Sequence, residues 1–312
     1  MTLAAALFTV TVWASAFVGI RSAGGALTPG ALSLGRLLIG GVVLGAILVV
    51  RGERLPPWSE LRRVAGPLLT CGLLWFAGYN LALNAAERRV DAGTAAMLVN
   101  IGPILIAILA GAILHEGFPR ALLTGCAVAF TGVVVIGLAT AESGTASTGG
   151  VALCLLAACA YAGGVVSQKP VLRHVSAMKT TFLCCAIGAT ACLPFAPQLL
   201  REVSVAPPRA LAWMLYLGVF PTALAFTTWA YALARSNAGR LAAMTYLVPP
   251  LSILLGWLLL GEAPPALAIA GGALCLVGVA ITRRGQTTVT RATRPERAAP
   301  VPADPGTAPE PP

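Results

Sequence analysis

The chain contains the same sequence pattern twice, and this duplication is what most constrains its fold. Residues 103–132 align with residues 249–278 at a constant offset of 146 positions. Nearer the start of each half the offset changes by one or two positions, so that Trp13 aligns with Tyr161 and Arg21 aligns with Lys169. The matches at the constant offset are Pro103 with Pro249, Glu116 with Glu262, Pro119 with Pro265, Gly125 with Gly271, and Gly132 with Gly278. A sequence repeated in this way predicts two structurally related halves.

Composition places this duplicated chain in a lipid membrane. Of its 312 residues, 57% are hydrophobic and 10% are charged, whereas a soluble domain carries about 25% charged residues. Such a chain cannot cover itself with polar surface. The net charge of +10 could suggest a nucleic-acid partner, but the cations lie in short loops and in the C-terminal tail and form no basic face. We therefore expect lipid as the solvent and no nucleic-acid partner.

The apolar segments are long enough for ten membrane-spanning helices. A bilayer core of about 30 Å requires about 20 apolar residues per helix. We therefore predict an all-α integral membrane protein, with Gly- and Pro-rich turns between its helices. The expected spans are 3–20, 31–50, 64–85, 92–114, 121–139, 150–168, 179–196, 210–232, 241–261 and 266–282.

The distribution of Lys and Arg predicts the orientation of these spans. With the N-terminus in the cytoplasm, 15 of the 21 basic residues lie on the cytoplasmic side and five lie outside. This excess follows the positive-inside rule, so we expect both termini in the cytoplasm. Five helices per half is an odd number, and the second half must then enter the membrane from the opposite side. The two five-helix repeats are therefore expected to be inverted.

We expect the first repeat to cover residues 1–140 and the second to cover residues 149–282. A tail over residues 283–312 differs from both in composition. It contains seven prolines and no apolar run. This composition is typical of a disordered segment, here on the cytoplasmic side.

Arg36 is the only charge well inside a predicted span. A central Arg is costly in a bilayer, so its position favours a function. Its repeat mate is Cys184, so the scaffold does not require a cation at this position. Two interpretations stay open. Arg36 contacts the substrate or a gate, or it has a structural role and either extends to the interface or satisfies backbone carbonyls.

Other polar and aromatic residues lie at similar depths. Trp13, Tyr79, Asn80 and Asn100 are candidates for substrate binding in the first half, and Trp229 and Tyr246 are candidates in the second. Pro103 and the pair Pro249 and Pro250 interrupt matching helices in the two repeats. Paired helix breaks point to a transporter's site, although a packing kink is the alternative.

The sequence contains no pattern for catalysis or for a cofactor. No Asp or Glu lies in the middle of a span, and no zinc-protease, nucleophile-elbow or nucleotide-binding motif is present. The eight cysteines lie in apolar segments without CxxC spacing, as expected of small packing residues. Glu116 and Glu262 are expected near the start of the helix that follows each of them. We therefore expect no enzyme, no metal and no cofactor.

Taken together, these residues resemble the drug/metabolite transporter superfamily, in particular its EamA-type members. The resemblance is carried by WASAF at 13–17, Arg36, YNLAL at 79–83, and the block 103–116 with its copy 249–262. It covers residues 1–282. It implies ten helices in two inverted bundles with both termini inside, and secondary transport of amino acids, other metabolites or toxic compounds. One departure is His115-Glu116, where many relatives have Gly-Glu, as Gly261-Glu262 does in the second copy.

We therefore expect a plasma-membrane exporter of amino acids or related small metabolites that works by alternating access. Helices 1, 3, 4, 6, 8 and 9 would line its central cavity, and helix 2 would contribute Arg36. Efflux of drugs or toxic compounds is an alternative, although a cationic drug would meet no embedded carboxylate. A membrane protein that does not transport is a further alternative. The sequence leaves open the substrate, the direction, the coupling ion, and whether the chain is a monomer or a homodimer.

Overall fold

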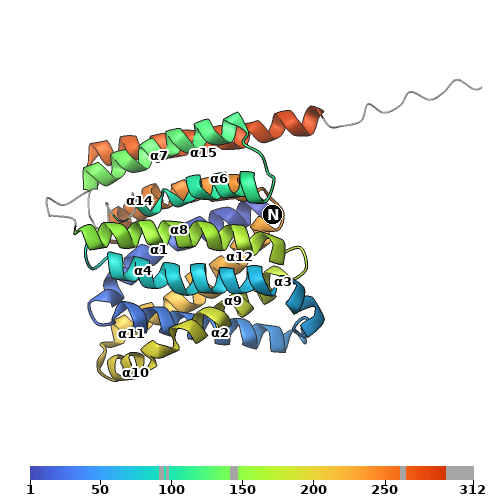
Figure 1. Ribbon diagram of the computed structural model, residues 1–312. Coiled ribbons are helices and arrows are strands. Elements are labelled where there is room, and N and C mark those ends of the chain that lie inside the picture. The colour runs from blue at the N-terminus through green and yellow to red at the C-terminus, as the bar shows by residue number, and fades with distance from the viewer. Residues whose placement is uncertain (91–94, 96–97, 141–146, 261–264, 293–312) are drawn as a thin grey trace, which may run out of the picture.

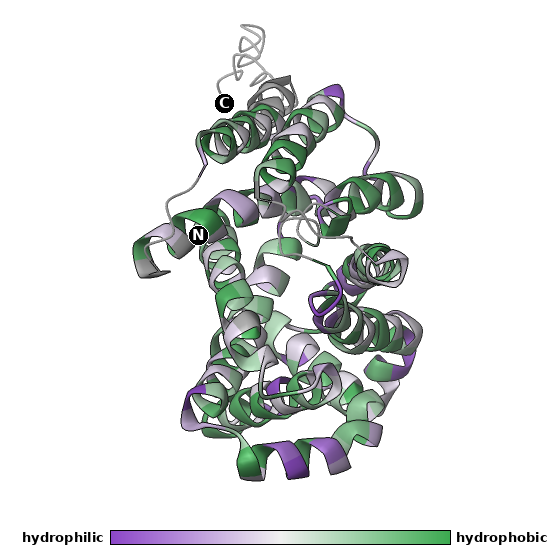
Figure 2. Cartoon of the chain, turned by 90° about the vertical axis from the view of Figure 1, so that its left-hand side faces the viewer, coloured by the Kyte–Doolittle hydropathy of each residue, from purple (hydrophilic) through white to green (hydrophobic). Residues whose placement is uncertain are grey.

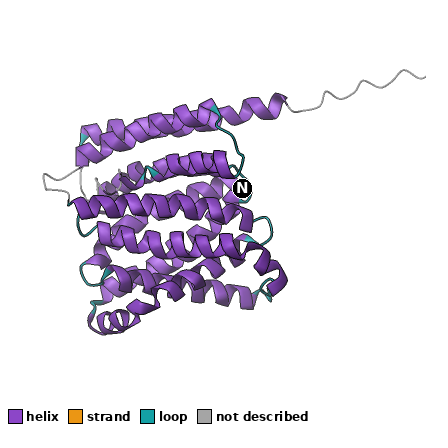
Figure 3. Ribbon diagram, in the orientation of Figure 1, coloured by secondary structure: helices purple, strands orange, loops and turns teal. Residues whose placement is uncertain are grey.

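The computed structural model describes residues 1–90, 95, 98–140, 147–260 and 265–292, and this part of the chain is helical without strands (Figure 3). Eight helices are long and apolar enough to cross a membrane, and two shorter apolar helices cover Gly102–Ile113 and Ala266–Thr282. Hydrophobic residues dominate along these helices, and polar residues occupy short stretches (Figure 2). The described residues therefore provide an apolar helix for each predicted span.

The described residues of the first half form a series of helical segments. They are α1 (Thr2–Gly24), α2 (Pro29–Val50), α3 (Trp58–Cys71), the π-helical segment η1 (Gly72–Tyr79), α4 (Asn80–Ala86), α6 (Gly102–Ile113) and α7 (Arg120–Thr140).

The second half repeats this order. It contains α8 (Thr148–Val171), α9 (Ala177–Cys192), η2 (Leu193–Phe195), α10 (Ala196–Val205), α11 (Pro208–Leu217), the π-helical segment η3 (Gly218–Ala225), α12 (Phe226–Leu233), α13 (Ala238–Ala243), the 3₁₀ turn η4 (Met244–Leu247), α14 (Val248–Leu260) and α15 (Ala266–Ala292).

Parts of three sequence predictions need comment. Within the predicted span 92–114, residues 92–94, 96 and 97 lie outside the described residues, as does residue 261 of the span 241–261. The last helix does not end at 282 but continues to Ala292. A helix can extend this far because no proline lies between Ala266, where α15 begins, and Pro295. The rest of the predicted tail, residues 293–312, also lies outside the described residues.

The two halves share an irregularity that the sequence did not reveal. The π-helical segments Gly72–Tyr79 and Gly218–Ala225 have the same length and are separated by 146 positions at both ends. Short π-helical insertions are uncommon and occur often at functional sites. Their matching positions show that the duplication extends to the backbone conformation of the third helix of each half.

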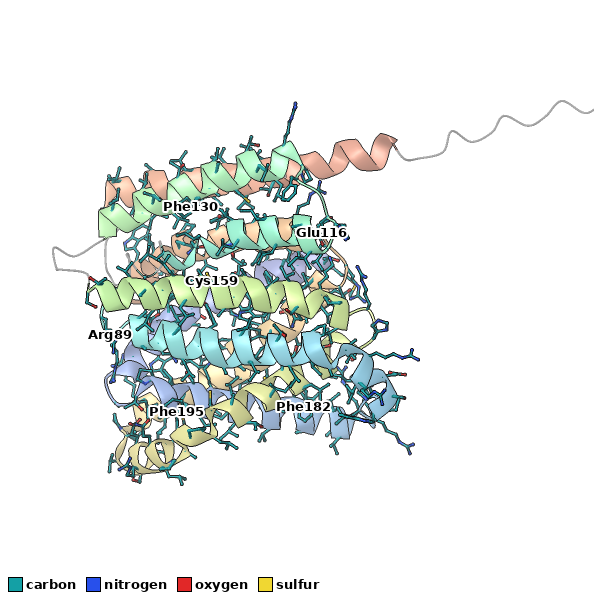
Figure 4. All side chains as sticks on the ribbon, viewed as in Figure 1. Arg89, Glu116, Phe130, Cys159, Phe182 and Phe195 are labelled. Carbon is teal, nitrogen blue, oxygen red and sulfur yellow. The ribbon has the colours of Figure 1, made fainter. Side chains whose placement is uncertain are left out.

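The helices run side by side, and the molecule has two distinct ends (Figure 1). Glu116 lies at the end where the chain starts and toward which α15 extends, and Arg89 lies at the other end (Figure 4). We call these the Glu116 end and the Arg89 end. Arg88 at the latter donates a hydrogen bond from Nη2 to the carbonyl oxygen of Gly24, over 3.1 Å, at the close of α1.

Helices α7 and α15 form a pair along one side of the molecule (Figure 1). Glycines allow their backbones to approach closely. A Cβ atom placed on Gly125 would lie 2.7 Å from the carbonyl oxygen of Gly278. Small residues of this kind are the usual means by which helices pack against each other in lipid, where the hydrophobic effect does not drive association.

Candidate functional site

A cavity lies between the two halves and extends from the middle of the bundle toward the Arg89 end. Its wall includes Ile20 and Leu83, each about one turn from the Arg89 end of its helix. The full lining is Trp13, Ala16, Phe17, Ile20, Arg36, Trp75, Tyr79, Asn80, Leu83, Val99, Asn100, Pro103, Tyr161, Phe226, Thr245 and Val248. These residues come from α1, η1, α4, the start of α6 with the residues just before it, α8, α12, η4 and the start of α14, with Arg36 from α2. These elements belong to the predicted spans 1, 3, 4, 6, 8 and 9, and α2 is the second span.

The cavity is of a size for a small solute. Its space open to the centre of a water molecule is about 80 Å³. One water requires about 10–15 Å³ by the same measure. The cavity can therefore hold several waters or a compact metabolite in this conformation.

The structure brings most of the predicted site residues together. Six of them line the cavity: Trp13, Arg36, Tyr79, Asn80, Asn100 and Pro103. Trp229, Tyr246, Pro249 and Pro250 are not part of this lining, and the side chains of Trp229 and Tyr246 are completely buried. Sequence reasoning estimated the depth of a residue along its helix, but the direction of each side chain depends on how the helices pack.

The hydroxyl of Thr222, next to Pro221, links Arg36 to the backbone of Leu217 through two hydrogen bonds. Pro221 has no N–H, so the carbonyl oxygen of Leu217, four residues earlier, lacks the donor that an α-helix would give it. The hydroxyl of Thr222 donates to that oxygen over 2.8 Å. The same hydroxyl accepts a hydrogen bond of 3.0 Å from Nε of Arg36. This arrangement orients the guanidinium and leaves its terminal nitrogens for another acceptor.

Arg36 is 5% exposed, and no carboxylate of the described residues lies within 4 Å of it, although Glu87 attracts it electrostatically from farther away. A buried cation without a close ion pair is unfavourable, and an Arg inside a membrane protein usually faces an anion or water. The planar guanidinium is well suited to bind a carboxylate through two parallel hydrogen bonds. The cavity therefore offers a binding point for an anionic group.

Asn80 stabilises the other π-helical segment. Its side-chain nitrogen donates to the carbonyl oxygens of Phe76, at 2.8 Å, and Trp75, at 3.3 Å. Both residues belong to η1, whose backbone departs from the α-helical hydrogen-bonding pattern. The Asn80 side chain also lines the cavity. Because the nitrogen is used for the backbone, the amide oxygen is the atom that remains for a ligand.

An aromatic cluster forms the floor of the cavity. The ring of Trp75 lies 4.8 Å from that of Phe226, 5.4 Å from that of Tyr161 and 6.0 Å from that of Trp13. Trp229 packs beneath, 5.1 Å from Trp13. Edge-to-face and tilted contacts at these distances are favourable, and they give the floor a rigid apolar surface.

Sequence reasoning did not select Trp75 or Phe226. The duplication contained a usable signal for Phe226, because it is the repeat mate of Asn80 at the 146-residue offset. Tyr161 is likewise the mate of Trp13, and both line the cavity. No comparable signal pointed to Thr222, whose role depends on the π-helical geometry around it.

Both helix interruptions lie beside the cavity. The turn at Asn100 and Ile101 precedes α6, which begins at Gly102 with Pro103 in its first turn. In the second half, α13 changes to the 3₁₀ turn η4 before α14 begins at Val248 with Pro249 and Pro250. The tighter turn gives the carbonyl oxygen of Thr245 a donor, the N–H of Val248, that Pro249 cannot supply.

Glu116 does not act as the sequence suggested. It lies four residues before α7, and its carboxylate accepts hydrogen bonds from the N–H groups of Ala238, at 3.0 Å, and Gly239, at 3.5 Å. It also forms an ion pair of 3.1 Å with Lys169. The preference of an acid for a helix N-terminus holds, but the helix is α13 of the other half. Its repeat mate Glu262 lies outside the described residues.

His115 has a left-handed backbone, with φ of 56°, and Gly117 follows with φ of 72°. Glycine adopts this region without steric cost, whereas other residues do so at a penalty. The second copy has a glycine, Gly261, at the position that corresponds to His115, and Gly261 lies outside the described residues.

The chemistry of the site is that of binding. Among the described residues, the cavity wall carries no carboxylate and no histidine. Within the described residues, no group of three His, Cys, Asp or Glu side chains is placed to hold a metal ion. A cation, amides, a hydroxyl and an aromatic floor can hold a small amphipathic molecule.

Comparison with known proteins agrees with this arrangement. The model of the EamA-like transporter family matches residues 1–138 and 148–284. The chain belongs to the EamA-like transporter family. It is therefore a multi-pass membrane transporter, not an enzyme, with the ten-helix fold of inverted repeats that this family has.

Two relatives are similar over most of this chain. A "probable terminal-alkyne amino-acid exporter" of Streptantibioticus cattleyicolor is 34% identical, over 90% of this chain and 92% of its own length. A "probable amino-acid metabolite efflux pump" of Salmonella typhimurium is 26% identical, over 70% of this chain and 78% of its own length. A solved crystal structure with 22% identity superposes with a TM-score of 0.74, over 92% of this chain and 98% of that one, which shows a shared fold.

Proposed function

We propose that this EamA-like transporter exports amino acids or closely related small carboxylates across the plasma membrane by alternating access. Both termini lie in the cytoplasm, as the 15-to-5 distribution of basic residues supports, so the cavity faces outward. The solute is the soluble partner, and lipid surrounds the single chain or a homodimer of it.

The observation that carries this proposal is the guanidinium of Arg36, which lies in the cavity wall without a close ion pair among the described residues. It has one hydrogen-bond partner, Thr222, and no carboxylate partner among the described residues. A solute carboxylate supplies the missing charge and removes the cost of a buried cation. The amide oxygen of Asn80 is a suitable acceptor for the solute's ammonium group.

The rest of the cavity suits an apolar side chain. Trp13, Trp75 and Phe226 present aromatic faces or edges to the same space that Arg36 lines. An amino acid with a slender apolar side chain fits a cavity of this size. Two relatives are described as exporting amino acids or their metabolites, which supports the same class.

Efflux of cationic drugs is the second candidate function. Aromatic rings can bind cations, which favours this function to a limited extent. However, the described cavity wall contains Arg36 and no acidic residue. A cation there would meet a like charge, so we place anionic and zwitterionic solutes first.

The test is an export assay in a bacterial host that carries the chain. Cells are loaded with dipeptides, and the extracellular amino acids are quantified by mass spectrometry for the wild type, Arg36→Ala, Arg36→Lys and the empty vector. Arg63→Ala, which removes an exposed cation, is the matched control. We expect the wild type and Arg63→Ala to raise specific amino acids outside, Arg36→Ala to lose the effect, and Arg36→Lys to retain part of it.

Two outcomes of this export assay would contradict the proposal. If the wild type is present in the membrane and no solute differs from the empty vector, amino-acid export is wrong. If Arg36→Ala exports as well as the wild type, the carboxylate contact is wrong. Resistance of the same cells to cationic dyes would then support drug efflux.

A further inference from the structure

Besides Tyr161, which lines the cavity, three buried polar side chains in the second half have no hydrogen-bond partner among the described residues. Gln168, Trp229 and Tyr246 are each 0% exposed. Both polar atoms of Gln168, the indole nitrogen of Trp229 and the hydroxyl of Tyr246 lack a partner among the residues that the structure describes. Buried polar groups are satisfied in the great majority of cases, so three such side chains in one region require an explanation.

The repeat relates these three residues to the cavity wall. Gln168 is the mate of Ile20 at the 148-residue offset that also pairs Trp13 with Tyr161. Trp229 and Tyr246 are the mates of Leu83 and Asn100 at the offset of 146. The three mates, Ile20, Leu83 and Asn100, all line the cavity, and none of the three unpaired residues does.

A second group of repeat pairs behaves differently. Both members of the pairs Trp13 with Tyr161, Asn80 with Phe226, and Val99 with Thr245 line the cavity. The floor of the cavity is thus shared equally by the two halves, while its wall toward the Arg89 end belongs mainly to the first half. Gln168 and Trp229 lie on the Glu116 side of the floor residues Tyr161 and Phe226 of their own helices.

In a transporter with inverted repeats, exchanging the conformations of the two halves converts one open state into the other. We propose that Gln168, Trp229 and Tyr246 line the pathway when this protein opens at its Glu116 end, and that the Gln168 amide hydrogen-bonds the solute there. This inference rests on the alternating-access transport proposed above. Their unpaired polar atoms are then the groups that water and solute satisfy in the other state.

One cluster of contacts holds the Glu116 end closed in the present conformation. Lys169, which follows Gln168 directly, pairs with Glu116 over 3.1 Å and donates a hydrogen bond to the carbonyl oxygen of Ser236. Glu116 also holds the first N–H groups of α13. We call this cluster the Glu116–Lys169 junction. It connects a loop of the first half with two helices of the second, so these contacts must part for that end to open.

Cysteine accessibility in the purified, full-length protein in detergent tests this inference. Ile20→Cys and Gln168→Cys are each reacted with a water-soluble maleimide, alone and together with Glu116→Gln and Lys169→Met. Labelling is followed peptide by peptide by mass spectrometry. Breaking the junction should increase the labelling rate of Gln168→Cys and decrease that of Ile20→Cys, each by about fivefold or more, the usual range of coupling between sites.

Native Cys71 provides the internal control because its side chain is 0% exposed and lies outside the proposed pathway. It should stay unlabelled in every variant, and labelling of Cys71 would reveal unfolding. The inference is overturned if the junction variants leave Gln168→Cys unchanged in the folded protein, or if both engineered cysteines become more reactive together.

Gln168→Leu provides a second readout that does not depend on labelling. It removes two unpaired buried atoms at similar volume, so thermal stability in detergent should rise while the transport rate falls at least severalfold. If Gln168 had only a structural role, its replacement would not raise thermal stability and lower the transport rate at the same time. Because the labelling needs no solute, a wrong amino-acid assignment would leave its result intact, whereas a wrong pathway assignment would remove it.

Discussion

Gly132 and Gly271 touch through their backbones across the interface of α7 and α15. A Cβ atom on Gly132 would lie 2.5 Å from the carbonyl oxygen of Gly271, and one on Gly271 would lie 2.7 Å from that of Gly132. The repeat maps this pair onto Gly278 and Gly125. This second pair approaches as closely: a Cβ atom on Gly278 would lie 2.6 Å from the carbonyl oxygen of Gly125, and one on Gly125 would lie 2.7 Å from that of Gly278. The pseudo-twofold symmetry of the duplication therefore exchanges α7 and α15 and leaves their interface unchanged.

Gly132→Ala is expected to destabilise this interface. The added methyl group would meet backbone atoms that cannot rotate away, and overpacking of this kind costs about 1–3 kcal/mol. Thermal unfolding in detergent measures the effect. Gly66→Ala is the matched control, because a Cβ on that helical glycine meets nothing within 4 Å. It should leave the midpoint unchanged or raise it slightly, and an equal loss in both variants would contradict the packing argument.

Thr222→Val is expected to weaken solute binding without removing any cavity residue. The change keeps the shape of the side chain but removes the hydroxyl that accepts from Arg36 and donates to Leu217. A hydrogen bond to a charged group is worth about 1.5–3 kcal/mol, which corresponds to about a 10- to 100-fold rise in the apparent KM for export.

Thr227→Val is the control for that prediction, because the Thr227 hydroxyl bonds only to the carbonyl oxygen of Ala223 in its own chain segment. It should leave KM close to the wild-type value. Equal KM values for the wild type and Thr222→Val would show that Thr222 does not position Arg36.

His115 should tolerate glycine better than a β-branched residue. At φ of 56° a side chain costs about 1–2 kcal/mol. His115→Gly removes this cost but adds freedom to the unfolded chain, so its unfolding midpoint should stay close to that of the wild type. His115→Val should lower the midpoint by about 2–4 °C for each kcal/mol lost. A stabilising valine would show that the strain is relieved in the folded protein.

Reporter fusions test the proposed orientation. A phosphatase that is active only outside the cytoplasm should be active when fused after Ala206, between α10 and α11, and inactive when fused after Val175, between α8 and α9. The physical reason is the excess of Lys and Arg on the side that holds both termini. The reversed pattern would place the termini outside and would turn the cavity toward the cytoplasm.

Much of the site could be predicted because depth in a membrane is encoded along one helix. Arg36, Asn80 and Asn100 were recognisable as polar residues well inside apolar runs, and all three line the cavity. Trp229 was placed at a suitable depth but packs beneath the floor, 5.1 Å from Trp13. Depth does not specify the face of the helix, which is decided by the neighbours it packs against.

The amino-acid sequence by itself determined the membrane environment, the number of spans and the inverted duplication. These follow from the lengths of apolar runs, the distribution of Lys and Arg, and the 146-residue repeat, all of which are properties of a linear chain. Only the tertiary structure decided that Thr222 holds Arg36 and that Glu116 binds α13 and Lys169. Those contacts join residues more than 50 positions apart, and their geometry depends on π-helical turns and glycine-mediated packing that local sequence patterns do not specify.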